Sequence, residues 1–353
     1  MAETEKIELM NFDQEGYLLD GEELVKTGEK MRDLADRVAD EGYDAIFLMG
    51  VGGTWDELMQ LEYLMNKFGD KDLEVYLIHA AEWNVMGHKR MTERSVVLTA
   101  SESGTTPEVL EACKKLKETG VRVFAMTSPD GPIGRAVGAE NCVKMASDHG
   151  AGGCEKGYYL ADCFGLRILN RRGCFPKYED FIDQTKGIWS DLLDIRKKFE
   201  PEAERLARAY ALAPYTMFIG SGALWGETIL FAMCILEEMQ WKRTRYISSA
   251  DFFHGTLELV EKGVPVFLFK GEDECRALDN RVEAFLKRGV TGDDDIVVID
   301  TAEYGIPGLD DEFRVIVSPW ILTSLVTDRL ARYYETVTKH NLKYRRYYHQ
   351  FDY

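Results

Sequence analysis

The sequence predicts an α/β protein made of two similar units, each a mainly parallel β-sheet sandwiched by helices. Short, nearly continuous apolar runs alternate with segments whose apolar residues recur at helical spacing. The order strand, glycine-rich turn, helix, strand occurs twice along the chain. A length of 353 residues with 45% hydrophobic content also suits two domains better than one core.

The first unit follows an acidic N-terminal segment. Helical spacing predicts a helix over about residues 21–41, and an apolar run predicts a buried strand at 44–49. A glycine-rich turn then leads into another helix. The remaining expected elements are a helix at 55–68, strands at 74–78, 95–99, 121–125 and about 142–145, and a helix at 107–119.

Long helices over about residues 156–210 lead to the second unit, where a strand at 215–219 again precedes a glycine turn and a helix at 224–241. The later expected elements are strands at 246–248, 264–269 and 295–299, and helices at 272–287 and 320–338. We therefore expect a first domain over residues 22–175, a second over 200–338, and a C-terminal tail over 339–353.

Composition excludes several classes of protein. A net charge of −18 argues against nucleic-acid binding, which needs clustered Lys and Arg. The seven cysteines are scattered without zinc-ligand spacing, and the histidines show no metal-binding pattern, so we expect reduced thiols and no metal. The N-terminal residues do not resemble a signal peptide, and no stretch has ~18 uninterrupted apolar residues. We expect a cytoplasmic protein without membrane or nucleic-acid partners.

The turn at residues 50–54 lies between a strand and a helix, where glycines permit close approach of an anion to the helix N-terminus. It contains Gly52, Gly53 and Thr54, but neither a dinucleotide fingerprint nor a nucleotide P-loop. Taken alone, an anion site and a purely structural turn are about equally good interpretations.

A second candidate loop, SESGTT at residues 101–106, also lies between a strand and a helix. It carries four hydroxyl side chains, and Pro107 suits the first helical position. One hydroxyl is enough to cap a helix, so four within six residues favour a phosphate site.

These segments carry a resemblance to a known family. SESGTT after an apolar strand, with a glycine-rich turn upstream, resembles the phosphate loop of the sugar isomerase (SIS) domain family. In the second half, LEEMQW at 236–241 and SSADFFHG at 248–255 resemble the isomerase half of glucosamine-6-phosphate synthase. They resemble still more the fructoselysine-6-phosphate and fructose-asparagine 6-phosphate deglycases, as does the Arg-Arg-Tyr in the tail. The resemblance spans residues 44–353 and implies two tandem SIS domains.

The resemblance also implies roles for particular residues. Glu238 would be the base that moves a proton between C1 and C2, and His254 would open the sugar ring. Other residues would bind the substrate: Gly52, Gly53, Thr54, Ser101, Ser103 and Thr106 at the 6-phosphate, Glu102 beside them, Glu155 and Lys156 at the sugar, and Arg346 in a tail that closes over the anionic ligand.

The residues themselves agree with this chemistry without requiring it. A carboxylate on an apolar helix such as that of Glu238 has its pKa raised towards the range of a general base, although most helical Glu side chains are simply solvated. His254 could equally be a structural histidine, and Arg345 and Arg346 could equally be surface charges.

We therefore expect an enzyme that hydrolyses a 6-phosphorylated fructosamine, such as fructoselysine 6-phosphate, to glucose 6-phosphate and a free amine. An aldose-ketose sugar-phosphate isomerase or an aminosugar-phosphate isomerase/deaminase would use the same Glu and His. A non-catalytic sugar-phosphate sensor could keep SESGTT but would not need Glu238 with His254. The chemistry needs no cofactor, because the substrate's own carbonyl and amine delocalise the charge. The resemblance also implies a homodimer or higher oligomer with shared active sites.

Overall fold

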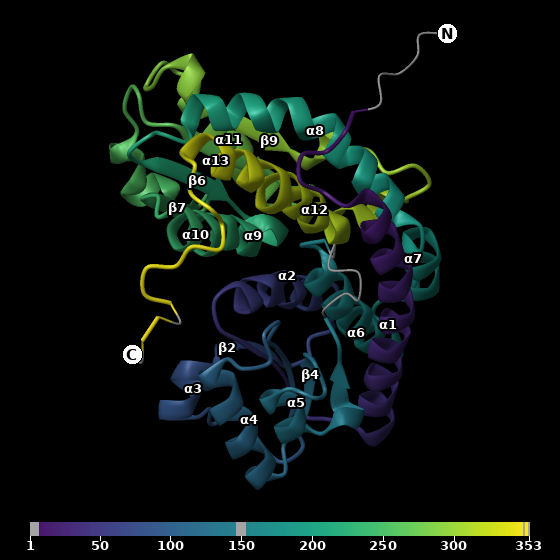
Figure 1. Cartoon of the computed structure of the whole chain (residues 1–353). Helices are drawn as coiled ribbons and strands as arrows, with labels where there is room; N and C mark the ends of the chain where they lie inside the picture. The colour runs from purple at the N-terminus through teal and green to yellow at the C-terminus, as the bar shows by residue number, and fades with distance from the viewer. Residues whose placement is uncertain (1–6, 146–152, 349, 352–353) are drawn as a thin grey trace.

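The computed structural model describes residues 7–145, 153–348 and 350–351, and it contains two parallel sheets (Figure 1). The first sheet has five strands in the order β2-β1-β3-β4-β5, and the second has four in the order β7-β6-β8-β9. Every strand pairing is parallel. Helices flank both sheets, so the predicted fold class is confirmed.

The first sheet follows the expected order of elements along the chain. Its central strands are buried at every position, because helices cover both faces. The strands are β1 (Ile46–Gly50), β2 (Val75–His79), β3 (Val96–Ala100), β4 (Arg122–Met126) and β5 (Cys142–Val143). The helices are α1 (Gln14–Glu41), α2 (Gly53–Phe68), α3 (Ala80–Met86), α4 (Pro107–Thr119) and α5 (Pro132–Val137).

Three helices connect the sheets: α6 (Lys156–Arg171), α7 (Tyr178–Thr185) and α8 (Ile188–Tyr210). The second sheet contains β6 (Thr216–Gly220), β7 (Thr244–Ser248), β8 (Val266–Lys270) and β9 (Ile296–Asp300). Its helices are α9 (Trp225–Ile229), α10 (Glu238–Gln240), α11 (Arg276–Leu286), α12 (Arg314–Thr323) and α13 (Ala331–Thr338). Two π-helical segments, η3 (Leu230–Glu237) and η9 (Ser324–Leu330), join α9 to α10 and α12 to α13.

The structure differs from the sequence prediction at several helices. Helix α1 begins at Gln14, not near residue 21, because the side chain of Asp13 accepts a hydrogen bond from the Gly16 amide (3.0 Å). Tyr17 is buried, so part of the acidic segment belongs to the core. The helices α3 and α5, of seven and six residues, were not predicted because they are too short to show a helical period.

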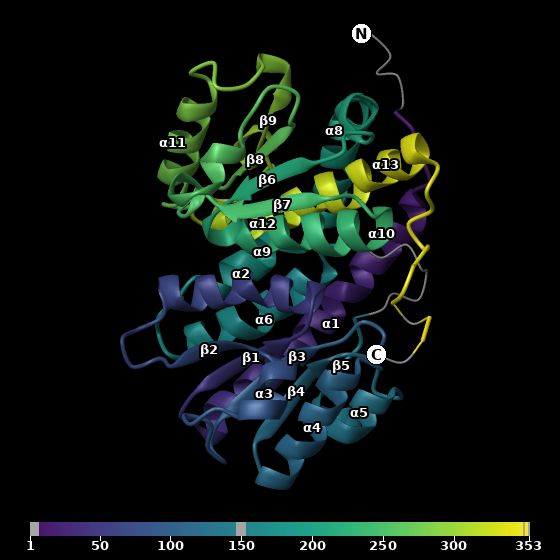
Figure 2. The ribbon, with the colours of Figure 1, turned by 90° about the vertical axis from the view of Figure 1, so that its left-hand side faces the viewer.

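Helix α2 lies between the two sheets and packs against both α6 and α9 (Figure 2). Glycines allow this close contact: a Cβ on Gly226 would lie 2.0 Å from the carbonyl oxygen of Asp56. A Cβ on Gly165 would lie 2.2 Å from Leu61. One hydrophobic cluster contains buried residues of both sheets. The predicted domain boundaries stay a prediction.

The C-terminal tail leaves α13, passes α10 and runs down towards the first sheet (Figures 1 and 2). It therefore lies beside both units. Across the described residues, no helix combines the length and the apolar character needed to cross a membrane. All seven cysteines are free thiols.

Candidate functional site

The two predicted phosphate-binding segments meet at one point of the first sheet. Strands β1 and β3 are neighbours, with Ile46 paired to Val96. The strand order places the next strand after β1 on one side and the next strand after β3 on the other. Open α/β sheets bind ligands at such a switch point, beyond the carboxyl ends of the strands. The glycine turn follows β1 and SESGTT follows β3, so both border this crevice.

The backbone of the glycine turn requires its glycines. Gly52 has a φ of 58°, in the left-handed region that side chains disfavour. A Cβ on Gly50 would lie 2.7 Å from the amide nitrogen of Trp55. The hydroxyl of Thr54 donates to the carbonyl of Val51 (3.2 Å) and so closes the turn at the start of α2.

The hydroxyls of SESGTT hold the loop in shape. The Oγ of the buried Ser101 lies 2.9 Å from the Thr106 Oγ1 and accepts a bond from the Gly104 amide (3.1 Å). The Ser103 Oγ accepts from the Thr105 amide (3.2 Å). Thr106 is the N-cap of α4 but makes no side-chain capping bond within the described residues. The first-turn N–H groups of α4 are therefore left for another acceptor, such as a phosphate.

A cavity of about 730 Å³ lies beside both loops. It brings together Gly52, Gly53, Thr106 and Glu238, four of the predicted site residues. The remaining lining residues come from the glycine turn, the first turn of α4, η3 and the tail: Val51, Pro107, Glu108, Cys234, Tyr348, Gln350 and Phe351. The cavity is thus built by the first unit, the second unit and the tail together.

Glu238 begins α10, directly after the π-helical segment η3. Its side chain is 33% exposed, and its Oε1 accepts a hydrogen bond from the Nε of Arg345 (2.8 Å). Cys234, one turn earlier, lines the same cavity. The carboxylate is therefore partly buried, open to the cavity and held by a cation from the tail.

Lys156 and Glu155 lie at the N-terminus of α6 but have different surroundings. The Lys156 Nζ is 2.5 Å from a carboxylate oxygen of Glu102, which anchors the exposed middle of SESGTT. Burial lowers the pKa of Lys156, but the charges of Glu102 and its neighbours outweigh this and raise it overall. Glu155 is fully buried, 2.8 Å from the Nη2 of Arg196, and it accepts a hydrogen bond from Tyr17. This core network takes up the Glu155 carboxylate, so the geometry gives no support for its predicted contact with the sugar.

His254 and Arg346 lie outside the main cavity. His254 is the exposed last residue of the 3-10 turn η4 (Phe252–His254), and its side chain has no hydrogen-bond partner in the part of the chain that the structure describes. The Arg346 guanidinium lies 4.3 Å from the centre of the Trp241 ring. Arg346 lines a neighbouring cavity of about 390 Å³ that also contains Glu238.

The sequence and the structure were compared with those of known proteins. No protein-family model matches the chain. The chain is 26% identical over 309 residues to the fructosamine deglycase FrlB of Bacillus subtilis, covering 86% of this chain and 91% of that one. It is 26% identical over 321 residues to the fructoselysine 6-phosphate deglycase of Escherichia coli, covering 89% and 88%. A crystal structure of a phosphosugar isomerase from Bacillus subtilis superposes with a TM-score of 0.82 at 22% identity, over 93% of this chain and 99% of that one.

The chain has the sugar isomerase fold. This agrees with the resemblance that SESGTT and the second-half motifs carry. The assignments of individual site residues stay predictions.

The structure shows two buried carboxyl groups near the cavity, those of Asp56 and Glu227, that the sequence analysis did not predict. Asp56 on α2 is fully buried, and the Cys234 thiol donates to its Oδ2 (3.7 Å). Burial raises the pKa of Asp56 to about 8. Burial likewise raises the pKa of Glu227 to about 7, although Tyr158 (2.8 Å) and Thr327 (2.5 Å) donate to its oxygens. In the sequence each of these residues is a single acidic residue within a predicted helix. Most acidic residues in helices are exposed to solvent, so the sequence alone did not indicate that these two are buried.

The turn after β6 in the second sheet resembles the glycine turn after β1, but an acidic side chain of the protein itself accepts a hydrogen bond from one of its backbone N–H groups. Gly222 after β6 has a φ of 55°, close to the value at Gly52. The loop after β8 places Asp273 against this turn, where its oxygens accept from the Ala223 amide (2.9 Å) and the Cys275 amide (2.7 Å). A carboxylate of the protein thus occupies the position at which the first unit leaves its amides open.

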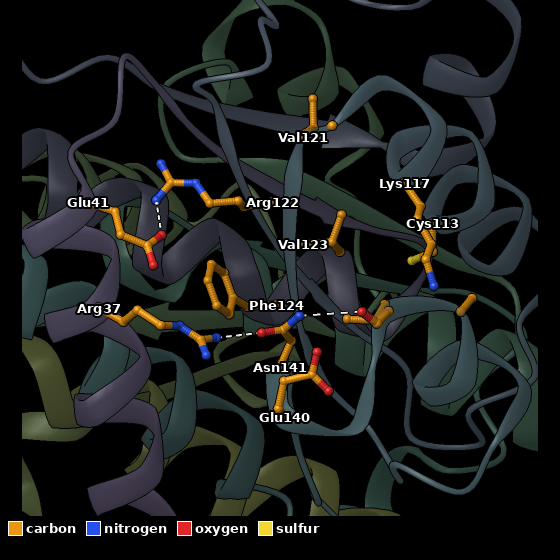
Figure 3. Close-up of a pocket in the computed structure, with 13 residues that line it drawn as sticks. Arg37, Glu41, Cys113, Lys117, Val121, Arg122, Val123, Phe124, Glu140 and Asn141 are labelled. Carbon is orange, nitrogen blue, oxygen red and sulfur yellow. Dashed lines mark hydrogen bonds and ion pairs between the residues drawn. The ribbon is translucent and has the colours of Figure 1, made fainter.

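A further cavity, of about 380 Å³, lies at the opposite end of the first sheet (Figure 3). Two of its arginines have partners: Arg122 is 2.8 Å from Glu41, and Arg37 donates to Asn141. It lies at the start of β4, away from the carboxyl ends of the strands where this kind of sheet binds ligands. Elsewhere in the described ranges, no group of three or more His, Cys, Asp or Glu side chains is arranged to hold a metal ion.

Proposed function

We propose that this protein is a deglycase that hydrolyses a 6-phosphorylated fructosamine to glucose 6-phosphate and a free amine. The observation that carries the proposal is the cavity that joins the two candidate anion-binding segments of the first unit to Glu238 of the second. The named relatives, a fructosamine deglycase and a fructoselysine 6-phosphate deglycase, support the substrate class.

The reaction needs a phosphate site at one end of the substrate and a base at the other. The N-terminus of α4 and the glycine turn would hold the 6-phosphate through backbone N–H groups, with Lys156 adding a positive charge beside Glu102. A fructosamine bound this way directs C1 and C2 towards Glu238. The proposed role of His254 is to open the ring by proton transfer.

Proton transfers and the addition of one water complete the reaction. Glu238 takes the proton from C1, the electrons of that C–H bond form the C1–C2 double bond, and the C2 oxygen takes up a proton to give a 1,2-enaminol. Return of a proton to C2 turns the enaminol into an imine at C1. Water adds to the imine carbon, and the C–N bond breaks to release the amine and leave glucose 6-phosphate. Glu238 is placed for both proton transfers because it is partly buried and open to the cavity.

The deciding experiment incubates the purified protein with fructoselysine 6-phosphate, glucoselysine 6-phosphate, fructose-asparagine 6-phosphate and fructose 6-phosphate. Glucose 6-phosphate and free amine are measured together. Equal amounts of both from a fructosamine 6-phosphate are the expected result. Conversion of fructose 6-phosphate alone would identify an isomerase, and binding without turnover of any compound would identify a sensor.

The Glu238→Gln variant tests the proposed base. We expect it to lose turnover while substrate affinity stays within a few-fold of wild type, because only proton abstraction is removed. The affinity measurement, by calorimetry, is the control for correct folding of the cavity. Retention of a large part of the wild-type kcat would contradict the assignment.

We also propose that the active sites are shared within a homodimer. His254 is exposed and does not line either cavity next to Glu238 in its own chain. A two-fold dimer would bring the histidine of one subunit to the cavity of the other and would do so twice.

A further inference from the structure

The cavity beside the proposed base carries positive charge in a strongly acidic protein. Lys242, Arg345 and Arg346 all line the cavity of about 390 Å³ that contains Glu238, whereas the whole chain has a net charge of −18. Glu237 lines it too, and its Oε1 accepts a hydrogen bond from the hydroxyl of Thr244 (2.5 Å). With Glu237 and Glu238 set against the three cations, the lining keeps one positive charge in excess, which favours an anionic ligand.

The backbone fixes Arg345 in place. Its Nη1 donates to the carbonyls of Leu342 (2.7 Å) and Tyr344 (3.0 Å), while its Nε donates to Glu238. The side chain of Arg345 is only 17% exposed. Its neighbour Arg346 instead stacks on Trp241. Of these two arginines, Arg345 is the one that donates to the Glu238 carboxylate, at Oε1.

Substrate geometry identifies the group that would enter this cavity. The proposed phosphate loops lie at the C6 end of the sugar, and Glu238 marks C1. The amine of a fructosamine is attached at C1, so its substituent must extend from Glu238 away from the phosphate loops. The cavity of about 390 Å³, with its three cationic side chains, lies next to Glu238, and none of its lining residues belongs to those loops.

We infer that this cavity, lined by Lys242, Arg345 and Arg346, is the subsite for a carboxylate on the amine part of the substrate, and that Arg345 determines specificity. This inference rests on the proposed function. In the free protein Arg345 donates a hydrogen bond to Oε1 of Glu238. A substrate carboxylate pairs with the guanidinium, which is suited to two parallel hydrogen bonds, and so leaves the Glu238 oxygen free to take the C1 proton. Substrates whose amine part has no carboxylate leave Glu238 paired with Arg345.

Two synthetic substrates that differ only in charge test the inference: the fructosamine 6-phosphates of ε-aminocaproic acid and of its amide. Wild type should prefer the acid in kcat/KM by about tenfold or more, the ratio expected from one hydrogen bond between charged groups. Arg345→Gln should abolish this preference, mainly by raising KM for the acid, and should turn over the amide faster, because Glu238 is then no longer paired with an arginine. Arg345→Lys should restore part of the preference.

Arg208→Gln is the matched control, because it breaks an ion pair (2.6 Å to Glu204) on the surface of α8. It should leave both substrates unchanged. Equal losses with both substrates in Arg345→Gln would overturn the inference, as would no loss with either, and melting temperatures check that the variants are folded.

Calorimetry with the same two compounds separates this inference from the proposed function. If wild type binds them but releases no glucose 6-phosphate, the proposed function fails. The acid-to-amide ratio of affinities in wild type and in Arg345→Gln then still decides whether the carboxylate subsite exists.

Discussion

At the scale of single residues, the site contains two kinds of carboxyl group with different surroundings. Glu238 reaches the cavity and is paired with Arg345. Asp56 and Glu227 lie behind it, fully buried, with pKa values raised by burial to about 8 and about 7. Near pH 7 Asp56 should therefore be mostly protonated in the folded protein and Glu227 about half protonated, whereas both would be ionised in the unfolded chain.

This difference predicts a pH dependence of stability. Between about pH 4 and pH 8 the folded state holds a proton on Asp56 that the unfolded state has lost, so its contribution to the free energy of unfolding falls as pH rises. Asp56→Asn imitates the protonated form. The variant should therefore gain stability relative to wild type by about 1.4 kcal/mol per pH unit across this range. Urea unfolding of both proteins at several pH values measures it, and a constant difference would show that Asp56 does not titrate there.

The hydroxyls of SESGTT provide a second residue-scale prediction. The double variant Ser101→Ala, Ser103→Ala should weaken binding of a 6-phosphorylated sugar but hardly change binding of the unphosphorylated analogue. Each lost hydrogen bond to a charged group costs about 1.5 to 3 kcal/mol. Because Ser101 also bonds Thr106 and Gly104, thermal melting must accompany the binding measurement. Equal weakening of both ligands would place the phosphate elsewhere.

At the scale of elements, long apolar runs were predictable and interrupted helices were not. The strands β1, β3, β6 and β8 lie close to their predicted positions because each is buried along its length. The helix predicted over residues 224–241 is instead α9, η3 and α10, since apolar spacing does not distinguish α from π hydrogen bonding. The pairing of Arg345 with Glu238 spans 107 residues, and no local pattern could reveal it.

The filled turn of the second unit gives a prediction for an element. Asp273→Ala removes the acceptor of two backbone N–H groups, those of Ala223 and Cys275, and should lower the free energy of unfolding by about 1 to 3 kcal/mol. Asp273→Asn, which keeps one acceptor oxygen, should lose less. Denaturant unfolding compares the two variants, and equal losses would show that these bonds do not stabilise the turn.

At the scale of the whole molecule, the two units and the tail are needed to form one site. The cavity draws on both units and on the C-terminal residues, while the exposed His254 does not line it. This arrangement leads to a prediction about mixed dimers. When inactive Glu238→Gln and His254→Ala subunits exchange freely, half of the dimers are mixed, and each mixed dimer has one of its two sites with both residues intact.

About a quarter of all sites should then recover activity. Mass spectrometry of the mixture checks that exchange has occurred. If exchange is complete and activity stays absent, Glu238 and His254 act within one chain.

The π-helical segment η3 immediately precedes Glu238 and so sets the direction in which this side chain projects. In an α-helix each residue turns the chain by about 100°, and a π-helical segment accommodates an additional residue between the same neighbours. If η3 relaxed to α geometry at its present length, Glu238 would therefore swing by about that angle. Removal of one residue compensates for this rotation: a variant lacking Met233 should form a regular helix with Glu238 in nearly the same direction, melt at a higher temperature and keep turnover. A shortened protein that folded but turned over no substrate would refute this.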